Sequence, residues 1–211
     1  MPRGNNKKMK ILVACEESQA VCKAFRAKGH EAYSCDILPS SGDNPEWHIQ
    51  GDVSEQLGKE WDMIIAHPPC TYLSNAGAVR LYHPKGVLDK KRYEKGMEAK
   101  EFFIQFYNAK CERVCIENPI PSSVFTLPKY DQIIQPYEYG HPYSKKTCLW
   151  LKGLPLLRPT NIITDNVISW VSAGSKDSKG NPRKNIGKVV DKTMRSKTFQ
   201  GIADAMAEQW G

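Results

Sequence analysis

Two short apolar segments of the chain each end in a polar motif that contains proline. Residues 63–66 are followed by the letters HPPC, which end in Cys70, and residues 113–116 are followed by ENP, which begins with Glu117. A short apolar run closed by such a turn signal is typical of a buried strand. A cysteine thiolate is a strong nucleophile, and a carboxyl group can donate or accept a proton. Because open α/β sheets carry their chemistry at the carboxyl ends of strands, the motifs predict a nucleophile and a proton donor facing one pocket.

Each motif also has a purely structural interpretation. A cysteine at a strand end is often no more than a small buried apolar residue, so Cys70 alone does not identify a reaction. Glu117 alone is equally typical of a carboxylate that caps the next turn. The combination favours chemistry, because a carboxylate after a buried strand is costly unless it is paired or used.

The start of the chain is typical of a strand, a helix and a second strand. Residues 10–14 and 31–37 are the predicted strands, and Ser18 stands where a helix N-cap is expected. The apolar face of this helix is Ala20, Val21, Ala24 and Phe25. Two strands joined by a helical crossover lie parallel, which predicts an α/β fold built on a mostly parallel sheet.

Asp36 lies at the end of the second predicted strand, where an acidic residue often binds the hydroxyl groups of a nucleoside ribose. The alternative is a surface aspartate that begins a turn. The segment from Ala14 to Ala20 contains no glycine, so the usual phosphate cradle is missing and a dinucleotide is disfavoured. A nucleoside ligand without a pyrophosphate, such as S-adenosylmethionine, needs that close backbone approach less.

The rest of the chain supplies the remaining elements. Residues 38–56 are expected to be irregular, and 71–89 form a long loop that suits a mobile lid. Apolar periodicity predicts helices over 89–110 and 197–210. Further strands are predicted over 133–139 and 146–151.

The net charge of +7 is concentrated in one segment. Residues 171–197 hold eight basic and two acidic side chains, and the remainder is nearly balanced. Such a stripe favours a polyanionic partner, most simply nucleic acid, although a solvated charged loop has the same composition.

Other classes of protein are disfavoured by composition. No apolar run is long enough to cross a bilayer or to form a signal peptide, so a cytoplasmic location is expected. Seven irregularly spaced cysteines suit reduced thiols better than a disulfide framework. Scattered His and Cys residues and the absence of a CxxC pair argue against a metal site.

These pieces resemble the DNA cytosine-5 methyltransferases. Pro69-Cys70 matches the family's Pro-Cys motif, and Glu117-Asn118-Pro119 matches its Glu-Asn-Val type motif with proline in third place. Asp36 matches the ribose-binding acid, Asp52 the adenine-contacting one, and 198–208 the last motif, a helix that returns to the cofactor pocket. The resemblance implies a Rossmann-like S-adenosylmethionine-dependent methyltransferase fold with helices on both faces of the sheet.

The resemblance also implies roles for individual residues. Cys70 would attack C6 of cytosine, Glu117 would bind or protonate N3, and C5 would take the methyl group of S-adenosylmethionine. The base must be flipped or single-stranded to be reached. The residues expected in the site are, for catalysis, Cys70, Glu117 and Asn118; for the cofactor, Cys15, Glu16, Glu17, Ser18, Asp36, Ile37, Asp52 and Pro68; and for nucleic acid, Tyr72, Ser74, Lys145, Lys146, Lys176, Arg183 and Lys184.

The chain departs from the family in three places. The family's Phe-x-Gly-x-Gly motif is replaced by the letters ACEES, and its Gln-x-Arg-x-Arg motif is absent, with 141–146 as the suggested substitute. The target-recognition domain is nearly missing, as in minimal enzymes of phages and mobile elements, which implies short specificity or a protein partner. The expected divisions are a flexible basic segment 1–9, a catalytic domain 10–153, a small basic insertion 154–196 and a closing helix 197–211.

Two other functions remain open. A methyltransferase fold that binds without catalysing would explain the glycine-free first motif. A cysteine-dependent enzyme that modifies C5 of free pyrimidine nucleotides would use the same nucleophile, although the basic stripe favours a polymer. An amino-methyltransferase is disfavoured, because Cys70 stands where that class places an aromatic residue after its two prolines.

Overall fold

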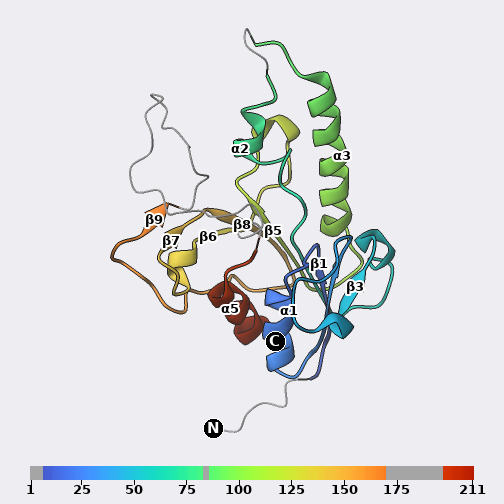
Figure 1. Ribbon diagram of the computed structural model, residues 1–211, viewed down its shortest axis with the longest axis vertical. Helices are drawn as coiled ribbons and strands as arrows, with labels where there is room; N and C mark the ends of the chain where they lie inside the picture. Colours follow the sequence, from blue (N-terminus) through green and yellow to red (C-terminus); the bar gives the residue numbers. More distant parts are fainter. Residues whose placement is uncertain (1–6, 83–85, 170–196) are drawn as a thin grey trace.

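A seven-stranded sheet forms the centre of the molecule (Figure 1). The computed structural model describes residues 7–82, 86–169 and 197–211. In the sheet the strands follow the order β3-β2-β1-β4-β5-β8-β6, and β7 and β9 pair separately. The first strand of the chain therefore lies in the interior of the sheet, between the second and the fourth.

Five of the seven strands run parallel and in consecutive pairing. They are β1 (Lys10–Ala14), β2 (Glu31–Asp36), β3 (His48–Gln50), β4 (Met63–Ala66) and β5 (Val114–Pro119). The other two are β6 (Gln132–Ile134) and β8 (Thr147–Lys152), and β8 lies antiparallel between β5 and β6. The predictions of strands over 10–14, 31–37, 63–66 and 146–151 are confirmed to within one residue at each end.

Helices cover both faces of the sheet. On one face α1 (Ala20–Ala27) and α5 (Gln200–Trp210) lie side by side, and on the other stands α3 (Lys90–Tyr107) (Figure 1). The alternation of side chains along β1 divides the core between them. Ile11 and Val13 pack with α1 and α5, whereas Leu12 packs with the aromatic side chains of α3, of which Phe103 and Phe106 are fully buried.

This arrangement confirms the mostly parallel α/β sheet predicted from the sequence. The protein has a Rossmann-like fold, with helices on both faces of the sheet. The helices predicted over 89–110 and 197–210 are present but shorter, as α3 and α5. Asp89 ends the loop before α3 and caps it, because its carboxylate accepts a hydrogen bond from Arg92 N.

The remaining elements are short. They are α2 (Asn75–Ala78), the 3-10 turns η1 (Pro45–Trp47), η2 (Val53–Glu55), η3 (Ser123–Phe125) and η4 (Pro136–Glu138), and the two-residue strands β7 (Tyr143–Ser144) and β9 (Ile168–Ser169). The segment 38–56 was expected to be irregular, yet it contains β3, which completes the edge of the sheet beside β2. Three residues between Pro45 and Gly51 are too few for a periodic signal.

Two predicted strands have different bounds in the structure. The strand predicted over 113–116 continues through Pro119, because β8 runs antiparallel along it and Pro119 pairs with Thr147. The strand predicted over 133–139 ends at Ile134, because Pro136 begins the 3-10 turn η4. The first difference comes from long-range strand pairing, and the second comes from the geometry of proline. Neither can be predicted from the local pattern of apolar residues.

The prediction that Ser18 caps α1 is wrong. The helix begins at Ala20, and the residue before it, Gln19, has a left-handed backbone with φ of 61°. The carboxylate of Glu16 supplies the cap instead: it accepts hydrogen bonds from Val21 N at 2.7 Å and from Cys22 N at 3.2 Å. The loop therefore starts the helix with a buried acidic side chain rather than with a serine hydroxyl.

The predicted basic insertion and basic N-terminus fall largely outside the described residues. Residues 1–6 and 170–196 are not described, so the division of the chain into 1–9, 10–153, 154–196 and 197–211 stays a prediction. In the described part of the chain, no helix is long and apolar enough to cross a membrane.

Candidate active site

Four polar side chains stand in a row across the carboxyl end of the sheet. Ala14 pairs with Cys35 on β2 and with Ala66 on β4, and Ala66 pairs with Ile116 on β5. The next residue along each strand therefore lies beside its neighbours, in the order Asp36, Cys15, His67, Glu117. Parallel pairing in register thus brings together residues from 15 to 117 of the sequence.

A cavity of about 430 Å³ lies over this row. This volume is in the usual range for a small-molecule site. Its lining comes from the ends of four strands, from the β7–β8 connection and from the segment before α5: Cys15, Glu16, Glu17, Ser18, Asp36, Leu38, His67, Pro68, Pro69, Cys70, Thr71, Glu117, Asn118, Pro119, Lys145, Lys197 and Thr198. The two predicted catalytic motifs and most of the predicted cofactor residues therefore face one space.

Cys70 is held by the backbone that surrounds it. The Asn118 side-chain amide donates a hydrogen bond of 2.8 Å to Pro68 O, and this contact is buried. Ser74 N donates to Cys70 O at 3.0 Å. The thiol is partly exposed, so it can be reached from the cavity, while its main chain is tied on both sides.

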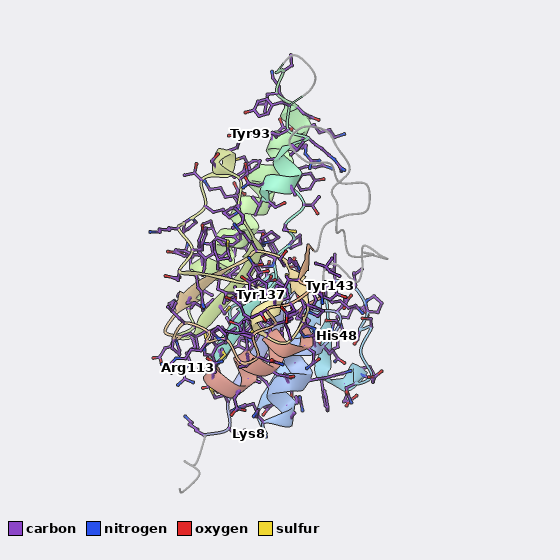
Figure 2. All side chains as sticks on the ribbon, turned by 90° about the vertical axis from the view of Figure 1, so that its left-hand side faces the viewer. Lys8, His48, Tyr93, Arg113, Tyr137 and Tyr143 are labelled. Atoms are coloured by element: carbon purple, nitrogen blue, oxygen red, sulfur yellow. The ribbon has the colours of Figure 1, made fainter. Side chains whose placement is uncertain are left out.

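The loop after Cys70 is fastened to β5 and to α3. Ser122 N donates to Leu73 O, which ties the loop to the segment that follows β5. Arg92, in the first turn of α3, donates to Thr71 O at 3.3 Å and to Gly77 O at 3.0 Å. Figure 2 shows the neighbouring Tyr93 near one end of the molecule and Lys8 near the opposite end. The described part of the predicted lid is therefore tied to the start of α3, toward the end of the molecule opposite Lys8.

His67 and Glu117 form a largely buried pair in the cavity wall. His67 Nδ1 lies 3.1 Å from Glu117 Oε2, and the two side chains are 9% and 15% exposed. Burial lowers the pKa of His67, but the hydrogen bond and charge of Glu117 and the charge of Glu16 outweigh it, so the pKa is raised. Burial raises the pKa of Glu117, but His67 and Lys145 outweigh it, so the pKa is lowered. Both shifts favour an imidazolium facing a carboxylate.

Glu16 has the opposite electrostatic balance. It is 5% exposed, and burial raises its pKa above the ordinary value against the opposing effects of His67 and of two backbone N–H groups. Its two oxygens are engaged at the start of α1. The structure thus uses this predicted cofactor residue as a helix cap, although the side chain also lines the cavity.

The cavity suits the nucleoside part of S-adenosylmethionine. Asp36 lies beside Cys15 with one carboxylate oxygen, Oδ1, bound by Leu38 N at 2.9 Å, and its side chain lines the cavity. Leu38 and Pro68 add apolar surface, and Leu38 is 54% exposed. A carboxylate for ribose hydroxyl groups beside apolar surface for a base is a fitting donor set. The turn achieves its shape without glycine, because Cys15 and Gln19 both adopt positive φ.

Two predicted cofactor residues lie outside the cavity lining. Ile37 is 73% exposed beside Asp36. Asp52 caps η2, where its carboxylate accepts a hydrogen bond from Ser54 N at 2.8 Å, and this contact lowers its pKa.

Burial, together with the charges of Asp36, Cys35 and Asp52, raises the pKa of the Cys15 thiol. Cys15 is therefore a neutral wall of the cavity rather than a second nucleophile.

The predicted nucleic-acid residues are dispersed. Lys145 lines the cavity, whereas Lys146 is exposed outside it. Tyr72 lies under Arg92 and Lys95, with 4.9 Å and 5.9 Å between charge and ring centre. Ser74 is buried, and its hydroxyl accepts a hydrogen bond from Gly77 N at the start of α2. Lys176, Arg183 and Lys184 lie outside the described residues.

Sequence reasoning missed several residues of the cavity lining, among them His67 and Lys197, whereas Thr198 begins the segment 198–208 that is expected to return to the cofactor pocket. His67 was passed over as part of a turn, although it is the first residue after an apolar strand, in the same position as Asp36 and Glu117. Lys197 and Thr198 reach the cavity because α5 docks beside α1, a long-range contact. The shared position after a strand was the signal that could have found His67.

The segment 141–146, suggested in place of the Gln-x-Arg-x-Arg motif, has a divided role. His141 Nε2 accepts a hydrogen bond from Gly201 N at 2.9 Å and so fixes the start of α5. Figure 2 shows Tyr143 near the middle of the molecule, where its ring lies 5.8 Å from that of Phe199. Only Lys145 of this segment lines the cavity. Among the described residues, no group of three His, Cys, Asp or Glu side chains could hold a metal ion.

Comparisons with known proteins give only distant similarity. No protein-family model and no curated protein matches the sequence. Among solved structures, the chain is similar to the Entamoeba histolytica methyltransferase EhMeth, with 13% identity over 75% of this chain and 58% of that one, at a TM-score of 0.44. It is also similar to a triple mutant of Spodoptera frugiperda DNMT2, with 14% identity over 78% of this chain and 55% of that one, at a TM-score of 0.38. The chain spans little more than half the length of these two proteins.

Proposed function

We propose that this protein transfers a methyl group from S-adenosylmethionine to C5 of cytosine in DNA. The observation that carries the proposal is the shared cavity: Cys70, Glu117 and Asn118 line the same space as Asp36. A nucleophile, a proton donor and a nucleoside-binding carboxylate therefore face one another. Each comes from the carboxyl end of a strand or from the loop just beyond it, where the fold places chemistry.

The reaction needs a thiolate because C5 of cytosine is a weak nucleophile. In the proposal Cys70 Sγ adds to C6, and N3 takes a proton, so that C5 gains the electron density of an enamine. S-adenosylmethionine supplies the methyl group that C5 accepts. Loss of the C5 proton then expels Cys70. Glu117 faces N3 in this scheme, while Asn118 keeps the backbone before Cys70 in place through Pro68 O.

Polymeric DNA is the proposed substrate because cationic side chains lie in the cavity lining and beside the loop after Cys70. Lys145 and Lys197 line the cavity, and Arg92 and Lys95 lie over Tyr72 in the loop after Cys70. Cations of this kind contact phosphates, and an aromatic ring offers a stacking face to an unpaired base. The cavity over the strand ends would hold one extruded cytosine, since chemistry on a base requires it to leave the stack.

The decisive experiment compares Cys70→Ser with wild type. Purified proteins are incubated with labelled S-adenosylmethionine and with double-stranded DNA, single-stranded DNA, RNA or free cytidine nucleotides, and 5-methylcytosine is measured. We expect wild type to label DNA and Cys70→Ser to lose labelling entirely.

The matched control is Cys111→Ser. This thiol is buried, bonds to Trp61 O and Arg113 O, and lies outside the cavity lining, so a hydroxyl can replace it without affecting the reaction. Equal labelling by Cys70→Ser and wild type would remove Cys70 from the mechanism. Labelling of free nucleotides in preference to DNA would overturn the substrate, and no calorimetric binding of S-adenosylmethionine would overturn the reaction.

A further inference from the structure

The proposed reaction gives no task to His67, one of the four residues in the row at the strand ends. Its backbone continues the pairing of β4 with β1, since His67 N donates to Ala14 O at 2.9 Å. Its ring lies at hydrogen-bond distance from Glu117 of β5, and the charge of Glu16, from the loop after β1, also acts on it. A strand end needs no histidine for its fold, and this one is buried, which is costly for an ionisable group.

The two ring nitrogens have different surroundings. Nδ1 faces Glu117 Oε2 at 3.1 Å. Nε2 is buried and, among the described residues, has no hydrogen-bond partner in the protein. Buried polar atoms are nearly always satisfied, so an unpartnered nitrogen in a cavity wall indicates a group or a water that the cavity receives. Glu117, which lines the cavity as His67 does, thus lies in hydrogen-bond contact with a ring that has one nitrogen to spare.

The proposed reaction creates a problem of proton supply. Glu117 must offer a proton to N3 when Cys70 adds to C6, because an ionised carboxylate would instead face the lone pair of N3. His67 and Lys145 both favour the ionised carboxylate, however, and Thr147 adds a side-chain hydrogen bond in the same direction. The proton that Glu117 delivers therefore has to be stored elsewhere in the site. Two cationic groups act on the carboxylate, His67 and Lys145, and His67 Nδ1 lies 3.1 Å from Glu117 Oε2.

We propose that His67 is a positioning residue that stores this proton and passes it through Glu117 to N3 of the flipped pyrimidine. This inference rests on the proposed function. The Nδ1–H bond of the imidazolium breaks, Oε2 of Glu117 takes the proton, and the carboxyl group gives a proton to N3. At the same time the C6–S bond forms and the electron pair displaced from the ring goes to N3. The thiolate and imidazolium charges cancel, and the carboxylate charge is unchanged.

The proton returns by the reverse route when the product forms. After methyl transfer N3 gives its proton back through Glu117, and Cys70 leaves as a thiolate. Nε2, the ring nitrogen without a partner among the described residues, is the position left for exchange of a proton with water. Three charged groups set the balance on the imidazole: Glu117 and Glu16 favour the cation, and Lys145 opposes it.

The test is the pH dependence of single-turnover methyl transfer into DNA for wild type, His67→Asn and Glu117→Gln. The Asn amide can donate to Glu117 from the position of Nδ1, but it cannot carry an additional proton. We expect the wild-type rate to fall as pH rises through the pKa of His67. In His67→Asn this alkaline limb is lost and the rate below it is roughly 10²-fold lower, the usual contribution of a positioned proton donor.

A double variant separates a relay from a purely structural pair. If His67 acts through Glu117, the variant with both substitutions is no slower than Glu117→Gln alone, because the second change removes nothing further. His30→Asn is the matched control: this histidine is also buried but lies before β2, at the opposite end of the sheet, and its variant should keep the wild-type profile. If His67→Asn fails to fold, His67→Gln takes its place.

The possible results are distinguishable. Wild type that methylates no DNA overturns the proposed function and the relay with it. Two results with an active wild type overturn the relay and leave the proposed function standing. In the first, the fall in rate at alkaline pH persists in the His67 variants. In the second, the rate losses of His67→Asn and Glu117→Gln multiply in the double variant.

Discussion

The side chain of Asn118 on β5 holds the backbone of Pro68 beyond β4. Asn118 Nδ2 donates a hydrogen bond of 2.8 Å to Pro68 O, and both residues are buried. This hydrogen bond joins the ends of two neighbouring strands. Asn118 directly follows Glu117, and Pro68 lies two residues before Cys70. The relationship gives the Glu-Asn-Pro motif two functions in one turn: Glu117 faces the cavity, and Asn118 fixes the loop that carries the thiol.

Asn118→Ala should both destabilise the protein and slow methyl transfer. The substitution removes the donor to a buried carbonyl oxygen, which typically costs about 1–3 kcal/mol in the free energy of unfolding. Urea denaturation measures that loss, and the single-turnover rate measures the displacement of Cys70. Asn108→Ala, at an exposed position after α3, should change neither. An Asn118→Ala protein with wild-type stability and rate would show that the contact does not position the loop.

Glu16→Gln should change how stability depends on pH. Burial raises the pKa of Glu16 above its ordinary value of 4.5. Below that value both the folded and the unfolded chain bind the proton, and the contribution to stability is complete. As pH rises the unfolded chain ionises first, so this contribution is lost until the folded pKa is passed.

The measurement is the free energy of unfolding of wild type and Glu16→Gln between about pH 4 and pH 8. The free energy of unfolding of wild type minus that of Glu16→Gln should fall as pH rises. The fall should be about 1.4 kcal/mol for each pH unit by which the pKa of Glu16 is raised in the folded protein. A flat difference for Glu16→Gln would contradict the raised pKa.

Much of the sheet could be predicted because its strands are short apolar runs. Residues 10–14 and 63–66 are fully apolar apart from Lys10, and each is buried on both faces of a parallel sheet, so no periodicity is required. Cys70 and Glu117 could be predicted to share a pocket for the same reason. Each follows such a run, and parallel strands bring their carboxyl ends together.

The other features of the fold and of the site depend on long-range contacts, which no local sequence pattern predicts. The first turn lacks the glycines of a phosphate cradle, yet Cys15 and Gln19 adopt the left-handed backbone themselves. Gln19 is held there by tertiary contacts: its fully buried side chain donates to Asn44 O and accepts from Asn44 N. The pairing of His67 with Glu117 likewise requires the register of β4 on β5, which apolar pattern leaves open.

Arg92→Ala should impair catalysis more than stability. Arg92 holds the loop after Cys70 by two hydrogen bonds to carbonyl oxygens and by its contact with Tyr72, all near the surface. Release of the loop should lower the methyl-transfer rate by about 10-fold to 100-fold, because small misplacements near a reacting group are costly. Lys91→Ala, at the adjacent exposed position, should keep the wild-type rate. A rate loss in Arg92→Ala that follows thermal stability in parallel would indicate a folding defect instead.

Gly201→Ala should displace α5 and weaken the binding of S-adenosylmethionine. A Cβ at Gly201 would lie 1.9 Å from Tyr139 O and 3.1 Å from His141 Nε2. Helix propensity alone favours alanine over glycine by about 0.8–1.0 kcal/mol. The clash is with rigid backbone, and overpacking of this kind typically costs about 1–3 kcal/mol, so the net effect should be destabilising.

Lys197 and Thr198, which line the cavity just before α5, should move with the helix start and raise the dissociation constant measured by calorimetry. Gly58→Ala is the matched control, because a Cβ there meets no atom within 4 Å. If Gly201→Ala were as stable as Gly58→Ala and bound S-adenosylmethionine as wild type does, the close approach of α5 to Tyr139 would have no part in forming the cavity. The expected outcome is that both properties change together, since one backbone contact fixes the helix that closes this side of the site.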